Sequence, residues 1–196
     1  MQVVVYKLGG SLLDFADLPA RLTELVASRP AHLPIFVCGG GASADIVRAW
    51  DKLHQLGEDR AHWLAIAALG FNDALLRQLF PSMQSVATRE EAVAVHAQGR
   101  WPLVDSHAFL SRDDAGDALP HNWNVTSDSI AARVARCWQA DELVLVKSTD
   151  LPESCTLRDA QDSGLVDAYF DRAARDVAAL SWVNLRVEPL HLQRWL

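Results

Sequence analysis

The segment Val3–Ser11 constrains the fold most strongly, because it joins a buried strand to a tight turn through a lysine. Its sequence is V-V-V-Y-K-L-G-G-S. β-Branched residues favour strands, and glycine lets the backbone turn tightly and lets a bulky anion approach it. Open α/β sheets bind ligands at the carboxyl ends of their strands. The chain has only three lysines, Lys7, Lys52 and Lys147. The position of Lys7 beside exposed backbone N–H groups predicts a phosphate site.

Strand patterns alternate with helix patterns along the chain. We expect strands at 3–6, 34–38, 84–87, 101–104, 143–146 and 182–187. Helices are expected at 18–27, from about 43 to a glycine at 57, and at 60–80, 89–98, 126–138, 156–160 and, for the most part, 165–180. Residues 106–122 have the composition of a loop. The alternation predicts an α/β fold, a three-layer αβα sandwich with a mainly parallel central sheet, in one domain spanning residues 1–196. The loops after Lys7, Cys38, Val104 and Lys147 then share one rim.

Composition excludes several classes of protein. The net charge is −7 and no basic stripe is present, so we expect no nucleic-acid partner. The three cysteines are scattered without C-x-x-C spacing, which predicts reduced thiols. The longest apolar run, residues 63–71, is too short to span a bilayer, and no signal-peptide pattern opens the chain. We therefore expect a cytoplasmic protein without a membrane partner.

Two further segments indicate phosphate chemistry. Gly39-Gly40-Gly41 follows a strand and precedes a helix, so its N–H groups are expected to form a second cradle, for an anion or for a polar substrate. The third segment, 124–129, is N-V-T-S-D-S, in which Thr126 is expected to cap a helix. Asp128 in the first turn could hold Lys7 or Lys147 by a charge-assisted hydrogen bond. Singly, each segment also fits an ordinary turn, a flexible loop or a helix cap; their combination in this order is more specific.

Other common sites are absent from the sequence. There is no G-x-x-x-x-G-K-[ST] phosphate loop and no G-x-G-x-x-G dinucleotide fingerprint. The seven histidines include no H-x-x-x-H pair, which argues against a zinc enzyme. His62 and His107 are expected to be ordinary helix and loop residues.

The three segments together resemble the amino acid kinase family, which includes acetylglutamate, aspartate and uridylate kinases. The matching motifs are K-L-G-G-S at Lys7, C-G-G-G at Cys38 and T-S-D-S-I-A-A at Thr126, followed by the strand L-V-L-V-K, in collinear order over most of the chain. V-R-A-W-D-K at 47–52, H-W-L-A-I at 62–66 and W-N-V-T-S-D-S at 123–129 are most similar to the small archaeal-type branch that phosphorylates an aminomethylfuran-methyl phosphate in methanofuran biosynthesis.

The resemblance implies roles for matching positions. Lys7 would touch the transferring phosphoryl group, and Asp128 would orient the catalytic lysine. The implied ATP- and phosphate-binding residues are Lys7, Gly9, Gly10, Ser11, Lys147, Ser148 and Asp150. The expected substrate-binding residues are Gly39, Gly40, Gly41, Arg48, Asn124, Thr126 and Ser127. The implied co-substrate is ATP, with Mg²⁺ carried by the nucleotide and not by protein side chains. Residues 1–122 would form the substrate lobe and 123–196 a shortened nucleotide lobe.

The chain also departs from the family pattern. Members usually carry a lysine late in the chain that reaches the leaving phosphate, whereas no lysine follows Lys147 here. Arg158, Arg172 and Arg175 are the candidates to replace it. Three functions stay open: a kinase of the furan phosphate, a family kinase for a carboxylate or a nucleoside monophosphate, and a non-catalytic binding or regulatory module. The helix at 60–80 is expected to pack in the core or, where exposed, to join two or more copies of the chain.

Overall fold

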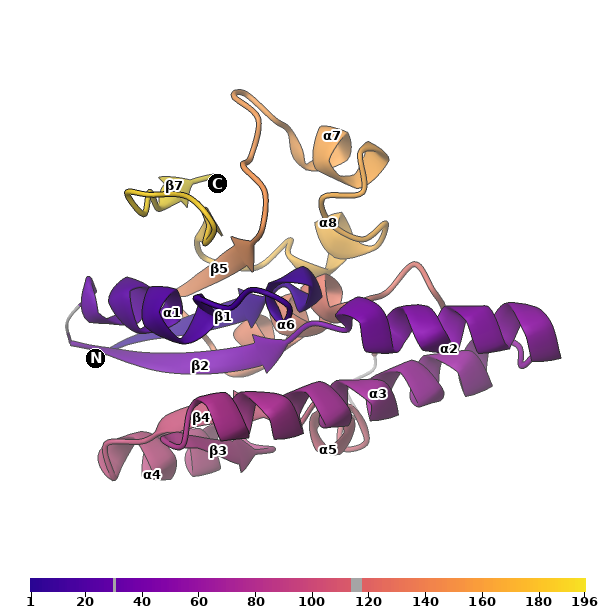
Figure 1. The fold of residues 1–196 in the computed structure, drawn as a ribbon, viewed down its shortest axis with the longest axis horizontal. Helices are drawn as coiled ribbons and strands as arrows, with labels where there is room; N and C mark the ends of the chain where they lie inside the picture. Colours follow the sequence, from indigo (N-terminus) through magenta and orange to yellow (C-terminus); the bar gives the residue numbers. More distant parts are fainter. Residues whose placement is uncertain (30, 114–117) are drawn as a thin grey trace.

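One seven-stranded sheet with helices on both faces organises the chain (Figure 1). The computed structural model describes residues 1–29, 31–113 and 118–196. The strands are β1 (Gln2–Leu8), β2 (His32–Cys38), β3 (Met83–Val86), β4 (Trp101–Val104), β5 (Glu142–Lys147), β6 (Leu180–Asn184) and β7 (Gln193–Arg194). Their order is β3-β4-β2-β1-β5-β6-β7, and among these described strands only β6 and β7 pair antiparallel. The predicted α/β sandwich with a mainly parallel sheet is confirmed.

The helices connect these strands and cover the sheet. They are the 3₁₀ turn η1 (Gly10–Leu12), α1 (Leu18–Ala27), α2 (Gly41–His54), α3 (Glu58–Leu79), α4 (Arg89–Ala97), α5 (Ser106–Leu110), α6 (Ser127–Cys137), α7 (Leu157–Asp162) and α8 (Phe170–Ala173). Within the described ranges, none of them combines the length and the apolar character needed to cross a membrane.

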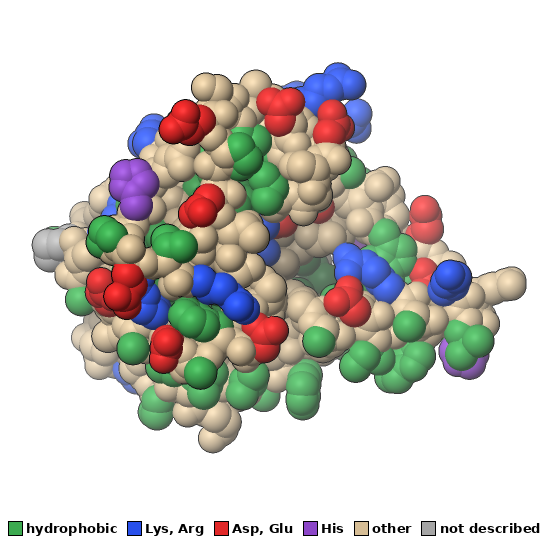
Figure 2. Space-filling view, turned by 45° about the horizontal axis from the view of Figure 1, so that its top comes forward, with side chains coloured by type: hydrophobic (Ala, Val, Ile, Leu, Met, Phe, Trp, Pro, Cys, Tyr) green, Lys and Arg blue, Asp and Glu red, His purple; other side chains and the backbone are tan. Residues whose placement is uncertain are grey.

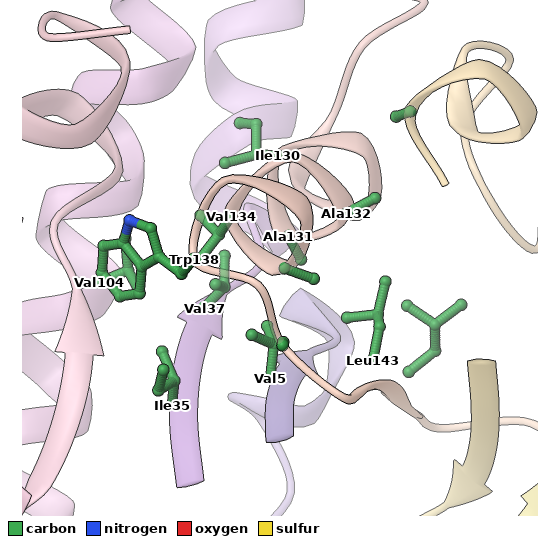
Figure 3. Close-up of a cluster of buried hydrophobic side chains, with 14 of the residues drawn as sticks. Val5, Ile35, Val37, Val104, Ile130, Ala131, Ala132, Val134, Trp138 and Leu143 are labelled. Carbon is green, nitrogen blue, oxygen red and sulfur yellow. The ribbon is translucent and has the colours of Figure 1, made fainter. Parts of the chain in front are cut away.

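The central strand β1 is buried on both faces, which explains its unbroken apolar run. Val5 points to the face covered by α6, where it shares a cluster with Ile130 and Val134 (Figure 3). Tyr6 points to the opposite face and belongs to a second cluster with Leu22 of α1. The period of two along the strand therefore supplies both cores of the sandwich.

Helices α2 and α3 pack against each other and extend beyond the carboxyl ends of the strands (Figure 1). We call this pair the α2–α3 arm. The spacing of Ile46, Trp50 and Leu53 puts them on one stripe of α2. This stripe faces solvent, with exposed fractions of 51%, 49% and 71%. Phe71 of α3 is also 74% exposed. The expected core position of the 60–80 helix thus holds for one of its faces, which carries Ile66 and other buried residues.

Two sequence-based expectations were wrong in the loops. Residues 106–122, predicted as loop, include α5, because the Asp105 carboxylate accepts the Ala108 N–H at 2.9 Å and caps a helical turn; residues 114–117 of that stretch lie outside the described residues. The mostly helical segment expected at 165–180 contains only α8 before β6 begins at Leu180. Phe170 of this segment is fully buried in the cluster of α6, so it packs without needing a longer helix.

The predicted helix end at Gly57 was displaced. Gln55 takes the left-handed conformation at φ 51° and ends α2, whereas Gly57, at φ 83°, precedes α3. The strand expected at 182–187 is β6, which starts at Leu180 and ends at Asn184; β7 near the end of the described chain was not expected.

Candidate active site

Lys7 and Lys147 lie at the carboxyl ends of the neighbouring strands β1 and β5 and meet at one carboxylate. The Nζ atoms of Lys7 and Lys147 lie 2.9 and 2.8 Å from the same Oδ1 of Asp128, in the first turn of α6. The Lys147 ammonium also donates to the Leu165 carbonyl at 2.7 Å. The two cations are therefore held together at the rim where α/β sheets bind ligands.

Burial and charge act in opposite directions on this cluster. Burial pushes the pKa of Asp128 upward, but the ammonium groups of Lys147 and Lys7 outweigh it and lower the pKa to about 2. Burial lowers the pKa of Lys147 to about 8, because the attraction of Asp128 only partly offsets desolvation and the repulsion from Lys7. Asp128 is therefore ionised at neutral pH, and it cannot accept and hold a proton there.

The two glycine loops pack directly on each other beside this cluster. A Cβ at Gly10 would lie within 2.5 Å of the Gly41 Cα, and a Cβ at Gly41 within 2.6 Å of the Gly10 carbonyl oxygen. Gly41 also adopts φ +50°, a backbone conformation that residues with a Cβ atom rarely adopt. Gly9 donates its N–H to the Val146 carbonyl at 2.7 Å. Glycine is thus required here for loop-to-loop packing, in addition to the approach of an anion that the sequence suggested.

Asn72 of α3 holds the triple-glycine loop in place. Its Nδ2 donates to the carbonyls of Gly39 and Gly40 at 2.8 and 2.7 Å, and its Oδ1 accepts from the Ser43 hydroxyl at 2.7 Å. Asn72 is 4% exposed, so these bonds satisfy a buried amide. The sequence signal for this role is the polar pair Asn72-Asp73 within an apolar helix.

A cleft of about 150 Å³ opens between the glycine loops, the α2–α3 arm and the start of α6 (Figure 2). Its floor is apolar. Its polar wall includes Lys7, Arg48, His62 and Thr126, and no carboxylate is among the described residues that line it. The Arg48 guanidinium lies over the Trp123 ring at 4.8 Å from the ring centre. The cleft therefore offers positive charge beside a flat apolar surface.

The start of α6 is capped by a residue that the sequence did not indicate. Thr126 occupies the N-cap position but its side chain makes no capping bond, contrary to our expectation. Its hydroxyl donates instead to Oδ2 of Asp167 at 2.9 Å, and the same oxygen accepts the N–H groups of Thr126 and Ser129 at 2.9 and 3.0 Å. Asp167, 39 residues beyond Asp128 in the numbering, thus sets the start of the helix that carries Asp128.

A second group of loop residues flanks β5 and β6 on the other side of Lys147. The hydroxyls of Ser11 and Ser148 are 2.8 Å apart, and Asp150 accepts from Asn184 at 3.0 Å. Arg186, which follows β6, donates to the Ser11 carbonyl at 2.8 Å. The structure therefore gathers the residues expected to bind nucleotide along one edge and adds Arg186 to them.

Comparison with known proteins identifies the family of this chain. Residues 2–150 match the model of the amino acid kinase family. The chain belongs to the amino acid kinase family. It is 26% identical over 156 residues to the (5-(aminomethyl)furan-3-yl)methyl phosphate kinase of Methanocaldococcus jannaschii; the match covers 74% of this chain and 66% of that protein.

Solved structures of family members show the same fold at low sequence identity. The uridylate kinase of Archaeoglobus fulgidus superposes with a TM-score of 0.62 at 19% identity, covering 93% of this chain and 90% of that one. The UMP kinase of Bacillus anthracis superposes with a TM-score of 0.65 at 16% identity, covering 96% and 89%. The resemblance noted in the sequence is confirmed for the family and its fold.

Some of the residues that we expected in the site do not line the cleft. Asn124 is exposed and its carbonyl accepts from the Tyr169 N–H; its side chain does not line the cleft. Gly39 is covered by Asn72, whereas Gly40, Gly41 and Ser127 line the cleft. Of the arginines proposed to replace a late lysine, Arg158 is 88% exposed beside Asp162, and the other two, at 172 and 175, line a separate cavity.

His62 lines the cleft, although its sequence context indicated an ordinary helix residue. It is 4% exposed, and its ring stacks on His121 at 4.7 Å. Burial, with the added effect of His121, lowers the pKa of His62 to about 4. A neutral imidazole therefore faces the cleft at neutral pH. Trp123 opens the motif at 123–129 but was not among the expected site residues, because a tryptophan before a helix has no distinctive spacing.

Proposed function

We propose that this protein is an ATP-dependent phosphotransferase whose acceptor is a small phosphorylated metabolite of the aminomethylfuran-methyl phosphate class. The observation that carries the proposal is the single carboxylate of Asp128 shared by Lys7 and Lys147 at 2.9 and 2.8 Å. Phosphoryl transfer depends mainly on positioning and on neutralising negative charge. Two fixed ammonium groups beside two glycine loops suit that requirement.

In the proposed step, an oxygen of the acceptor phosphate attacks the γ-phosphorus of ATP. The bond from that phosphorus to the β–γ bridging oxygen breaks, and ADP leaves with the electron pair, giving a diphosphate ester. Lys7 and Lys147 neutralise charge on the moving group and the leaving oxygen, and Mg²⁺ enters with the nucleotide. Asp128 positions the two lysines and takes no proton, which agrees with its low pKa.

The cleft supports an anionic, compact acceptor. Arg48 and Lys7 are the cations on its wall, and guanidinium groups bind phosphate through paired hydrogen bonds. Ala65 and Ile66 offer an apolar surface for a small ring. Residues 1–122 would then supply most of the acceptor side and residues 123–196 the nucleotide side.

The test is ATP consumption with (5-(aminomethyl)furan-3-yl)methyl phosphate, UMP, and N-acetylglutamate with hydroxylamine trapping as separate acceptors. We expect turnover with the furan phosphate and a loss of at least 100-fold in Lys7→Ala. Lys52→Ala is the matched control, because Lys52 is the exposed third lysine of the chain. Absence of turnover with every acceptor, or equal turnover in Lys7→Ala, would reject the proposal. Turnover with UMP or trapping of an acyl phosphate would assign a different family substrate.

A binding module is the second candidate, because no lysine follows Lys147 and Arg158, Arg172 and Arg175 lie outside the cleft. Such a protein would bind the phosphorylated metabolite without transfer. Titration with ATP–Mg²⁺ separates the two functions: nucleotide binding supports the kinase, whereas metabolite binding without nucleotide binding supports the module.

We further propose that two copies of the chain associate through the α2–α3 arm. Trp50 and Leu53 of α2 and Phe71 of α3 are large, apolar and about half or more exposed. Exposed large apolar side chains gathered on one protruding element mark association sites. Light scattering after size exclusion should give a dimer mass for the wild type and a monomer mass for Leu53→Glu/Phe71→Glu. A monomeric wild type would contradict the proposal.

A further inference from the structure

A second cavity, of about 210 Å³, lies between α6 and α8, and arginines dominate the part of its wall that the structure describes. Arg133 and Arg136 come from α6, Arg172 from α8, and Arg175 from the residues just after it; Tyr169 adds a phenol. A chain with a net charge of −7 thus places four guanidinium groups around one hollow. None of the residues that we assign to the proposed kinase reaction lines it.

Carboxylates near this cavity pair with some of its guanidinium groups. Arg133 is buried, with a side-chain exposure of 2%, and binds both oxygens of Asp113 at 2.7 Å. Arg136 lies 3.8 Å from Asp176. Among the described residues, the guanidinium of Arg172 contacts the Tyr169 ring and has no carboxylate partner.

Arg175 likewise has no ion pair with any described residue, and it lies on the open side of the cavity with Arg172. Two guanidinium groups therefore face the cavity without carboxylate partners from the described chain. Guanidinium groups repel one another across a small gap unless an anion lies between them.

We propose that this cavity binds a compact phosphate-bearing anion, about the size of pyrophosphate, at a site separate from the proposed active site. Planar guanidinium groups match phosphate oxygens in pairs, and several of them together favour an anion with more than one charge. The buried Arg133 gives the site a fixed floor, since its orientation is set by both oxygens of Asp113.

The same two helices also carry the supports of the active site. Asp167, three residues before α8, caps α6 through Thr126 and Ser129, and Asp128 in that first turn holds both lysines. An anion held by Arg172 and Arg175 in this cavity between α6 and α8 would fasten the two helices together at a second point. The anion should therefore stiffen the start of α6 and regulate the reaction; this regulatory consequence rests on the proposed function, whereas the binding site does not.

The binding test is calorimetric titration with inorganic pyrophosphate at low ionic strength. The proteins compared are the wild type, Lys7→Ala, Arg172→Gln/Arg175→Gln, and the control Arg158→Gln, an exposed arginine of α7 outside the cavity. We expect binding to persist in Lys7→Ala and Arg158→Gln and to weaken at least tenfold in the double variant. Thermal unfolding without ligand verifies that each variant is folded.

Two results would overturn the assignment. Equal pyrophosphate affinity in the double variant and the wild type would show that Arg172 and Arg175 do not bind the anion. Loss of all binding in Lys7→Ala would place the only anion site at the proposed active site. Citrate serves as a parallel ligand, and tighter binding of citrate than of pyrophosphate would refute the phosphate class.

Hydrogen exchange tests the coupling without any measurement of turnover. Pyrophosphate should slow amide exchange in the first turn of α6, around Asp128, in Lys7→Ala as well as in the wild type, and should leave the double variant unchanged. Unchanged exchange in the wild type at saturating pyrophosphate would contradict the coupling while leaving the binding site intact. Failure of the proposed kinase activity would affect neither measurement.

Discussion

Gly10 and Gly41 lie so close together that each excludes a side chain from the other: a Cβ on Gly10 would come within 2.5 Å of the Gly41 Cα. These residues belong to loops after two neighbouring strands, β1 and β2, so their contact fixes how the two loops approach each other. The two proposed phosphate- and acceptor-binding loops therefore form one unit, and a change in one loop must displace the other.

The first prediction follows from this contact. Gly10→Ala should lower the melting temperature and reduce turnover at least 100-fold, because the methyl group would meet backbone atoms that cannot rotate away. Gly70→Ala is the matched control, since a Cβ there meets nothing within 4 Å on α3; it should stabilise the protein by about 0.5–1 kcal/mol. Differential scanning calorimetry and initial rates measure both effects. A Gly10→Ala protein as active as the wild type would contradict the rigid packing of the loops.

Asp128→Asn should remove the shared partner of two buried ammonium groups. Breaking a buried ion pair from one side costs about 3–5 kcal/mol, so the urea midpoint at pH 7 should fall and turnover should be lost. The control is Asp162→Asn, whose partner Arg158 is 88% exposed; its effect should stay within about 0.5 kcal/mol. An Asp128→Asn protein of wild-type stability would show that the two lysines do not depend on this carboxylate.

The lowered pKa of Lys147 predicts that activity and stability change in opposite directions as the pH rises. Its pKa is lowered from 10.5 to about 8 by burial, so the folded protein loses this proton at lower pH than the unfolded chain. Between about pH 8 and 10.5 the unfolded state binds more protons, and the contribution of Lys147 to stability rises with pH. Turnover should instead fall as pH rises through about 8, because the ammonium charge disappears.

Lys147→Arg tests the assignment, because arginine keeps its charge over this range. The variant should have a lower maximal rate and should lack the fall near pH 8. A wild-type rate that is flat from pH 7 to 9.5, or a variant that keeps the same fall, would show that another group controls the profile.

Asn72→Ala should act on acceptor binding through the triple-glycine loop. The change leaves the Gly39 and Gly40 carbonyls without their buried donor, which costs about 1–3 kcal/mol. We expect a raised KM for the acceptor with a smaller change in the KM for ATP. Gln78→Ala, at an exposed position of the same helix, is the control. Equal changes in both KM values would indicate a general loss of stability in place of a local effect.

Arg48→Ala tests the charge assigned to the acceptor. Loss of one charge-assisted hydrogen bond of about 1.5–3 kcal/mol corresponds to a rise of roughly 10- to 100-fold in the KM of the acceptor. The KM for ATP should change little. Arg60→Ala, exposed on α3 and outside the cleft lining, should have no such effect. An unchanged acceptor KM in Arg48→Ala would show that Arg48 does not bind the acceptor anion.

The sequence by itself determined the local features of this protein. The β-branched run before Lys7 predicts a buried strand, and the alternation of strands and helices predicts the parallel sheet, because these patterns depend on neighbours in the chain. The glycine loops and Asp128 could be located for the same reason, since a strand end or a helix start brings its own residues to the rim of the sheet.

Only the tertiary structure decided which distant side chains support those features. Asp167 caps α6 and Asn72 binds the triple-glycine loop, yet each acts on a segment about 30 or more residues away in the numbering. The exposed stripe of Ile46, Trp50 and Leu53 has the same spacing as a buried one. Periodicity reports that a helix has an apolar face, whereas the packing of the whole chain determines what, if anything, covers that face.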